Sequence, residues 1–228
     1  MGIYRLESNI SCAIFTKDQL DAFMEKLMEN PFGNYQFLMD NTTEELDTFP
    51  FDQSLLEKQF TKKRTWDFTI HNNTDEGNFI EILMMQGKRG GTINVIAQDE
   101  SLYDQYQVFY NYILDIVNCI PPVSSAFTYD ANADLSGLYD ELNLDFAPAC
   151  FKAHLKWQHL LGPAYYTLFF TKEDLLNMPT YKVEELENGL INIVNYENPF
   201  DWNAKENKDR VVELTAYLNE RDIFIKDF

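Results

Sequence analysis

A hairpin signal near the end of the chain constrains the fold more than any other segment. The stretch VEELENGLINIVNYENPFDW, which begins at Val183, places Asn188 and Gly189 between two apolar runs. Asparagine and glycine accept the positive φ that a two-residue type I′ turn needs at both central positions, so an antiparallel strand pair is predicted. Pro199 ends the second strand because proline cannot donate to a ladder. We interpret this hairpin as scaffold.

The two-residue loop also predicts the register of the hairpin. The expected cross-strand pairs are Glu187 with Leu190, Leu186 with Ile191, Val183 with Val194, and Tyr181 with Tyr196. A slip of one residue would move the two valines to opposite faces of the sheet, so register and burial are tied together. Phe200 and Trp202 are expected to pin the following turn against the core.

Strand-type and helix-type patterns alternate along the rest of the chain. Strands are predicted over 9–15, 65–71, 78–86, 92–98, 124–129 and 151–157. Helices are predicted after N-caps at Thr16, Ser101 and Asn203, and from Pro163 to about residue 177. The predicted fold class is α+β, with antiparallel or mixed sheets and flanking helices. It forms either a single domain over 1–228 or two similar halves, 1–122 and 123–228.

The charge balance bears on the partner. The 228 residues include 18 Lys plus Arg and 37 Asp plus Glu, which gives a net charge of −19. Binding to nucleic acid or to an anionic membrane needs clustered basic residues, so the chain is expected to do neither. Such a charge favours a basic protein partner, although it also serves solubility alone. The oligomeric state stays open.

The cysteines indicate the compartment. Cys12, Cys119 and Cys150 are odd in number, widely spaced and without a C-x-x-C pair. That pattern is typical of reduced thiols, so a cytoplasmic protein is expected.

A long segment lacks basic residues altogether. No lysine or arginine occurs between Arg89 and Lys152, whereas aspartate and glutamate recur throughout. Part of this segment makes a candidate partner-binding strip, in which acids would speed encounter and tyrosines would anchor the partner. Its residues are Tyr129, Asp130, Asp134, Tyr139, Asp140, Glu141 and Asp145. A chance run, helped by a buried helix within the segment, is the other interpretation.

Motifs for catalysis are absent from the sequence. There is no nucleotide-binding glycine loop, no H-E-x-x-H and no G-x-S-x-G, so no catalytic residue, metal or cofactor is predicted. Cys150, His154 and His159 are the best candidates for a metal site or a Cys–His pair. In a strand the two histidines would lie on opposite faces, and in a helix His159 would turn away from the other two.

The last third of the chain resembles a known family through its order of structural residues. Bacterial immunity proteins show the same order, which here is Trp157, Leu161-Gly162-Pro163, Pro179, the strand from Val183 to Leu186 with Gly189, and Pro199 before Asn203. These proteins protect a cell from its own type VI secretion or polymorphic toxins. The resemblance covers roughly 151–218 and leaves the N-terminal half unmatched.

The resemblance implies a non-enzymatic inhibitor. Such a protein binds a cognate toxin and blocks its active site or holds it in an inactive state, and an acidic inhibitor suits a toxin with a basic cleft. The leading hypothesis is therefore an immunity protein that neutralises its toxin by stoichiometric binding. The alternatives are a small enzyme with a site near Cys150, His154 and His159, or an acidic scaffold or regulatory subunit.

Overall fold

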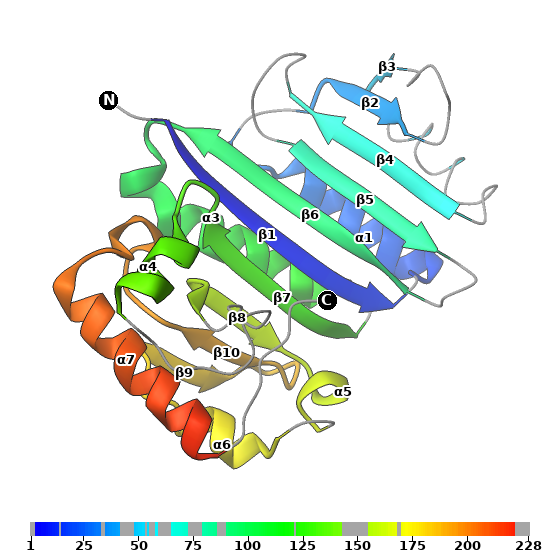
Figure 1. Cartoon of the computed structure of the whole chain (residues 1–228). Coiled ribbons are helices and arrows are strands. Elements are labelled where there is room, and N and C mark those ends of the chain that lie inside the picture. Colours follow the sequence, from blue (N-terminus) through cyan, green and yellow to red (C-terminus); the bar gives the residue numbers. More distant parts are fainter. Residues whose placement is uncertain are drawn as a thin grey trace. The chain divides into compact units, whose positions relative to one another are not determined.

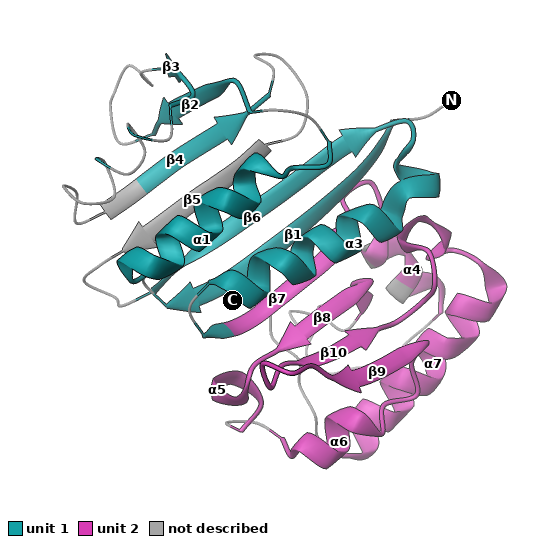
Figure 2. Ribbon diagram, turned by 180° about the vertical axis from the view of Figure 1, so that it is seen from behind, with its two compact units in different colours: residues 1–123 teal, residues 124–228 magenta. Residues whose placement is uncertain are grey.

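The computed structural model divides into two compact units, Met1–Val123 and Ser124–Phe228 (Figure 2). It describes residues 3–13, 15–32, 35–41, 48–52, 54, 58, 65–72, 79–85, 90–120, 122–142, 155–167 and 170–221. Figure 1 labels the elements along the chain. Each unit combines an antiparallel sheet with helices, which confirms the α+β class.

Unit 1 is built on one antiparallel sheet, which includes the strands predicted over 9–15, 65–71, 78–86 and 92–98 and two short strands that were not predicted. Its strands are β1 (Tyr4–Ala13), β2 (Phe37–Asp40), β3 (Thr48–Pro50), β4 (Thr65–His71), β5 (Phe79–Met85) and β6 (Gly90–Asp99). Their order in the sheet is β3-β2-β4-β5-β6-β1, and every neighbouring pair is antiparallel. Strand β1 begins and ends earlier than the predicted 9–15.

Two helices, α1 (Lys17–Met28) and α3 (Leu102–Cys119), cover the same face of this sheet (Figure 2). Helix α1 starts with the predicted capping box, in which the Thr16 hydroxyl accepts from the Gln19 N–H and the Gln19 side chain accepts from the Thr16 N–H. Helix α3 follows the predicted apolar spacing and turns Phe109, Ile113 and other apolar residues inward. Burial of these stripes stabilises both helices more than their intrinsic propensities do.

The register of β1 and β6 explains which strand residues meet those helices. Leu6 lies opposite Ala97 and Ile10 opposite Ile93, and all four side chains are buried. Polar side chains of β1 alternate with them, as expected for a strand with one buried face.

Unit 2 contains shorter elements. They are β7 (Val123–Asp130), α4 (Leu135–Glu141), β8 (Gln158–Leu161), α5 (Pro163–Tyr166), α6 (Lys172–Leu176), β9 (Lys182–Glu185), β10 (Ile191–Val194), the 3₁₀ turn η3 (Pro199–Asp201) and α7 (Lys205–Glu220). The strands pair antiparallel in the order β7-β8-β10-β9.

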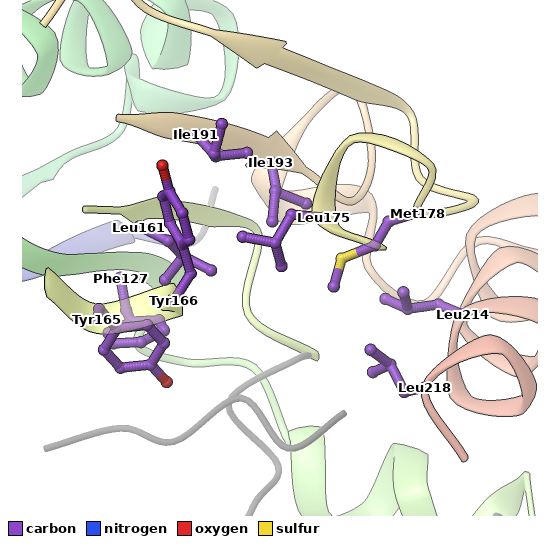
Figure 3. Packing of buried hydrophobic residues seen from close by; sticks show 10 residues of the cluster. All are labelled: Phe127, Leu161, Tyr165, Tyr166, Leu175, Met178, Ile191, Ile193, Leu214 and Leu218. Atoms are coloured by element: carbon purple, nitrogen blue, oxygen red, sulfur yellow. The ribbon is translucent and has the colours of Figure 1, made fainter. Parts of the chain in front are cut away.

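The core of unit 2 gathers residues from nearly all of these elements (Figure 3). Sheet residues such as Phe127 and Ile193 meet Leu175 of α6 and Leu214 of α7. The full cluster comprises Phe127, Leu161, Tyr165, Tyr166, Leu175, Met178, Ile191, Ile193, Leu214 and Leu218. One face of the sheet is therefore sealed by α5, α6 and α7.

The predicted hairpin forms, but the predicted register was wrong by one residue. Val183 pairs with Ile193, not with Val194. The Gly189 N–H donates to the Leu186 carbonyl, and the Leu186 N–H donates to the Leu190 carbonyl, so the loop has three residues. Gly189, at φ +80°, has the left-handed conformation that closes such a loop after a type I turn. This register keeps Val183 and Ile193 on the core side together.

Three other local predictions need correction. Of the strand expected over 151–157, residues 151–154 lie outside the described part of the chain and 155–157 are not in a strand, which begins only with β8 at Gln158–Leu161. The helix expected from Pro163 to 177 is two helices, because Thr171 and Asp174 form a second capping box that starts α6. The last helix has its N-cap at Ala204, not Asn203, since η3 shifts the start of α7.

Candidate protein-interaction surface

The acidic strip centres on helix α4, which follows strand β7 after a short turn. Asp134 is its N-cap, and its carboxylate accepts from the Gly137 N–H at 2.7 Å. Leu138 is buried and anchors the helix. The side chains of Asp134, Asp140 and Glu141 are exposed. Three carboxylates of the predicted strip therefore lie on the surface at one short helix.

Asp130 does not belong to that surface. It is only 8% exposed, and its carboxylate accepts from the Asn132 N–H at 2.9 Å and from the Trp202 side chain. Burial raises the pKa of this carboxyl above its ordinary value, and the two hydrogen bonds oppose that rise. Asp130 thus ties β7 to the segment before α7, and the sequence pattern could not distinguish this role from a contact.

Glu141 is committed in part to an ion pair. The Lys208 ammonium on α7 lies 2.7 Å from its carboxylate, and the lysine side chain is mostly covered. This pair fastens α4 to α7 and offsets part of the negative charge of the strip. Its neighbour Asp140 is exposed as well.

The remaining members of the strip divide between described and undescribed residues. Tyr129 is half-buried, and the Lys156 ammonium lies 4.5 Å from the centre of its ring. Tyr139 is in α4, but its side chain is outside the described part of the chain, as is the whole of Asp145.

The residues assigned to scaffold occupy structural positions. The Trp157 indole N–H donates to the Tyr196 carbonyl at 2.8 Å inside the core. Gly162 is the N-cap of α5, and Pro163 is the first residue of that helix. The Asn188 side chain accepts from the Leu190 N–H. Pro199 is buried at the start of η3.

The alternative catalytic set is not assembled in the described residues. His159 is fully buried in β8, where its ring meets the Phe127 ring edge-on at 5.5 Å. Cys150 and His154 lie outside the described residues. Burial raises the pKa of Cys12 to about 12 and that of Cys119 to about 11, so both described thiols are protonated and weakly nucleophilic at neutral pH.

The described residues contain neither a metal-binding cluster nor a membrane-spanning helix. No group of three or more His, Cys, Asp or Glu side chains among them is placed to hold a metal ion. No helix among the described segments combines the length and the apolar character that crossing a bilayer requires.

Exposed carboxylates occur in both units, which the strip prediction did not anticipate. In unit 1 they include Asp18, Asp21, Glu25, Asp99, Glu100, Asp104 and Asp115. The last four fall inside the segment without lysine or arginine, so the signal was present in the sequence. The expectation of a buried helix within this segment holds for only one side of α3.

Comparison with known proteins gives a likeness in fold. No protein-family model matches the chain, and no curated protein matches it. Among solved structures, the chain is similar to the Pseudomonas aeruginosa T6SS protein PA0821, with a TM-score of 0.59 and 14% sequence identity. The match covers 96% of this chain and 73% of that one. The likeness shows a shared fold that extends over both units.

Proposed function

We propose that this chain is an immunity protein of a type VI secretion or other polymorphic toxin system, which neutralises a cognate toxin by stoichiometric binding. The likeness to a T6SS protein over 96% of the chain carries this proposal. The resemblance of the last third to immunity proteins supports it independently. Because the net charge of this chain is −19, we infer that the toxin surface it contacts is basic.

The proposed mechanism is occlusion without chemistry. Exposed carboxylates at α4, chiefly Asp134 and Asp140, steer the toxin and contact it. Placement of His159 inside the core supports the non-catalytic assignment, because a fully buried imidazole cannot reach a substrate. We place the encounter in the cytoplasm, where an immunity protein meets toxin that enters or is made in the cell.

The direct test is protection in co-expression. The product of the gene adjacent to this one is expressed in a sensitive host, alone and with this chain, and viable counts are compared. Restored viability and a stable one-to-one complex on size exclusion are expected. Equal killing with and without the chain would contradict the proposal. Restored viability without any complex would favour an enzyme, whereas a complex without protection would favour a scaffold.

A matched pair of variants tests the role of α4. Asp140→Lys reverses an exposed charge on α4, and Glu213→Lys makes the same change at an exposed site of α7. Slower association with the adjacent-gene product and a flatter salt dependence are expected for Asp140→Lys only. Equal on-rates for the two variants would remove α4 from the interface and leave the proposed function standing.

A further inference from the structure

Helix α3 of unit 1 presents an unusual face to solvent. Seven of its residues point into the core, and the opposite side of the helix is exposed along its length. We call this exposed side the α3 face, and it consists of Asp104, Gln107, Val108, Asn111, Asp115 and Asn118. No lysine, arginine or glutamate occurs anywhere in α3.

That composition is closer to an interface than to an ordinary surface. Solvent faces of helices are usually rich in lysine and glutamate, and the core of an interface is depleted in lysine, glutamate and aspartate. The α3 face lacks the first two, and its aspartates lie toward its two ends, where the polar rim of an interface would be. Val108 is 41% exposed near the middle of the face, and the Gln107 amide donates to Asn111 beside it at 3.4 Å. Tyr103 flanks the face, 37% exposed, with its ring 5.4 Å from that of Tyr4. Such a supported tyrosine is a frequent binding anchor.

The charge of the α3 face is negative at both ends. Asp99 and Glu100 precede the helix and are exposed, and hydrogen bonds from Ser101 lower the pKa of Asp99, so it is ionised at neutral pH. Acids at this end also suit the positive end of the helix dipole, so they have a structural reason to be there.

Asp115 has a weaker structural reason for its charge, the attraction of Lys26. It lies toward the C-terminal end of α3, where the helix dipole disfavours a carboxylate. The nearby Lys26 ammonium is attracted to it, but that ammonium is hydrogen-bonded to Glu29 at 2.6 Å, and the neighbourhood stays negative. Helix stability alone would favour a neutral or basic residue at this position.

We propose that the α3 face is a docking surface for the toxin, separate from α4. This inference rests on the proposed function and names a second contact for it. The complementary toxin surface carries two lysine or arginine side chains about 16 Å apart, the separation of Asp104 and Asp115 at the α-helical rise per residue. Between them lies an apolar or amide-bearing patch that covers Val108 and Asn111.

Charge complementarity selects this occupant over a second copy of the chain. A two-fold pairing of α3 faces would set Asp104 of one copy against Asp115 of the other. Like charges placed together in an interface are unfavourable, so self-association through this face is disfavoured. A basic partner turns the same carboxylates into attractive contacts.

Two exposed valines on the two longest described helices provide a matched test. Val108→Arg alters the α3 face, and Val212→Arg makes the same change on α7, where Val212 is 44% exposed. The adjacent-gene product is the probe, and its Kd is measured by calorimetry for wild type and both variants, with thermal melting as a check on folding. Val108→Arg is expected to weaken binding by about 30-fold or more, the loss typical of a hot-spot residue, and Val212→Arg by less than about 3-fold.

A second variant tests the charges without adding bulk. Asp104→Asn combined with Asp115→Asn should slow association and flatten its salt dependence, with the melting temperature unchanged or slightly raised. If wild type binds and both α3 variants bind equally well, the docking surface is refuted and the proposed function survives. If wild type itself neither binds nor protects, both fall. A wild-type dimer that Val108→Arg converts to a monomer would also refute the proposal, because the face would then serve self-association.

Discussion

Helices α3 and α7 bury similar apolar stripes, but their exposed faces differ in composition. Each turns aromatic or aliphatic side chains toward the sheet of its own unit. Outside, α7 carries charges of both signs, among them Lys205 paired with Asp209, one turn further along, and Lys208 paired with Glu141. Helix α3 carries aspartates, amides and a valine there, and no base.

The difference separates what folding demands from what it leaves free. A helix on a sheet must bury an apolar stripe, so the inner faces of α3 and α7 had to be alike. The outer face is set only by solubility unless something binds there. A mixed-charge face such as that of α7 meets this requirement by itself. The base-free face of α3 exceeds it, and for that reason it is the better place to look for function.

The largest effect on stability is expected from the buried faces, in which α3 and α7 are alike. Phe109→Ala in α3 and Leu218→Ala in α7 each remove a fully buried side chain, so each should lower the free energy of unfolding by about 2–5 kcal/mol. Urea denaturation at constant pH measures this. A loss below about 1 kcal/mol in either helix would show that its inner face is not a true core, and the comparison would fail.

Substitutions at the N-caps of α3 and α7 should change stability less than the core substitutions do. Neither α3 nor α7 has a side-chain hydrogen bond at its N-cap. Ala204 has extended backbone angles that suit a cap, so Ala204→Ser should stabilise by about 0.5–1 kcal/mol. Ser101 is in helical conformation and makes no capping bond, but its side chain is hydrogen-bonded to the Asp99 carboxylate. In an Asp99→Asn background, where that charged acceptor is gone, Ser101→Ala should change stability by less than about 0.5 kcal/mol. Equal effects of opposite sign at the two sites would contradict this assignment.

The outer face of α7 should matter little for stability. Lys208→Ala removes the ion pair with Glu141, whose carboxylate is more than half exposed, so the expected loss is about 0–1 kcal/mol. Repeating the melt in high salt should shrink the difference further, because salt screens an exposed pair. A larger, salt-insensitive loss would mean that the pair contributes more to holding α4 against α7 than an exposed ion pair does.

Asp99, just before α3, and Asp130, which is hydrogen-bonded to Trp202 just before α7, should contribute to stability with opposite pH dependence. Hydrogen bonds lower the pKa of Asp99, so its stabilisation is full above the ordinary aspartate pKa and is lost as pH falls toward the native value. Burial raises the pKa of Asp130, so its penalty is absent below the ordinary pKa and grows as pH rises to the native value. As pH rises from 3 to 7, Asp99→Asn should therefore lose stability relative to wild type, and Asp130→Asn should gain stability relative to wild type. Parallel pH profiles for the two variants would contradict the assigned environments.

Much of the secondary structure could be predicted because its causes are local. The reciprocal bonds of Thr16 and Gln19, the apolar spacing of α3, and the alternation of β4 depend on residues a few positions apart. The same holds for the short helix α6, whose capping box at Thr171 and Asp174 is also local and divides the helix predicted over 163–177.

The hairpin register and the place of Asp130 could not be predicted this way. Asn188-Gly189 is compatible with a two-residue or a three-residue loop, and the choice was settled by Val183 and Ile193 reaching the core that Leu214 completes. Asp130 lies among aspartates that look alike in sequence, and only the tertiary structure buries it and brings the Trp202 side chain within hydrogen-bond reach.

The amino-acid sequence by itself determined the α+β class, the antiparallel pairing, the starts of α1 and α3 and a surplus of negative charge, because hydrophobic period, caps and composition act over short range. Tertiary structure alone decided which carboxylates face solvent, which are tied to Lys208 or Trp202, and that one side of α3 is left open. Those outcomes depend on contacts between distant segments, whose free energies of burial and pairing no local pattern encodes.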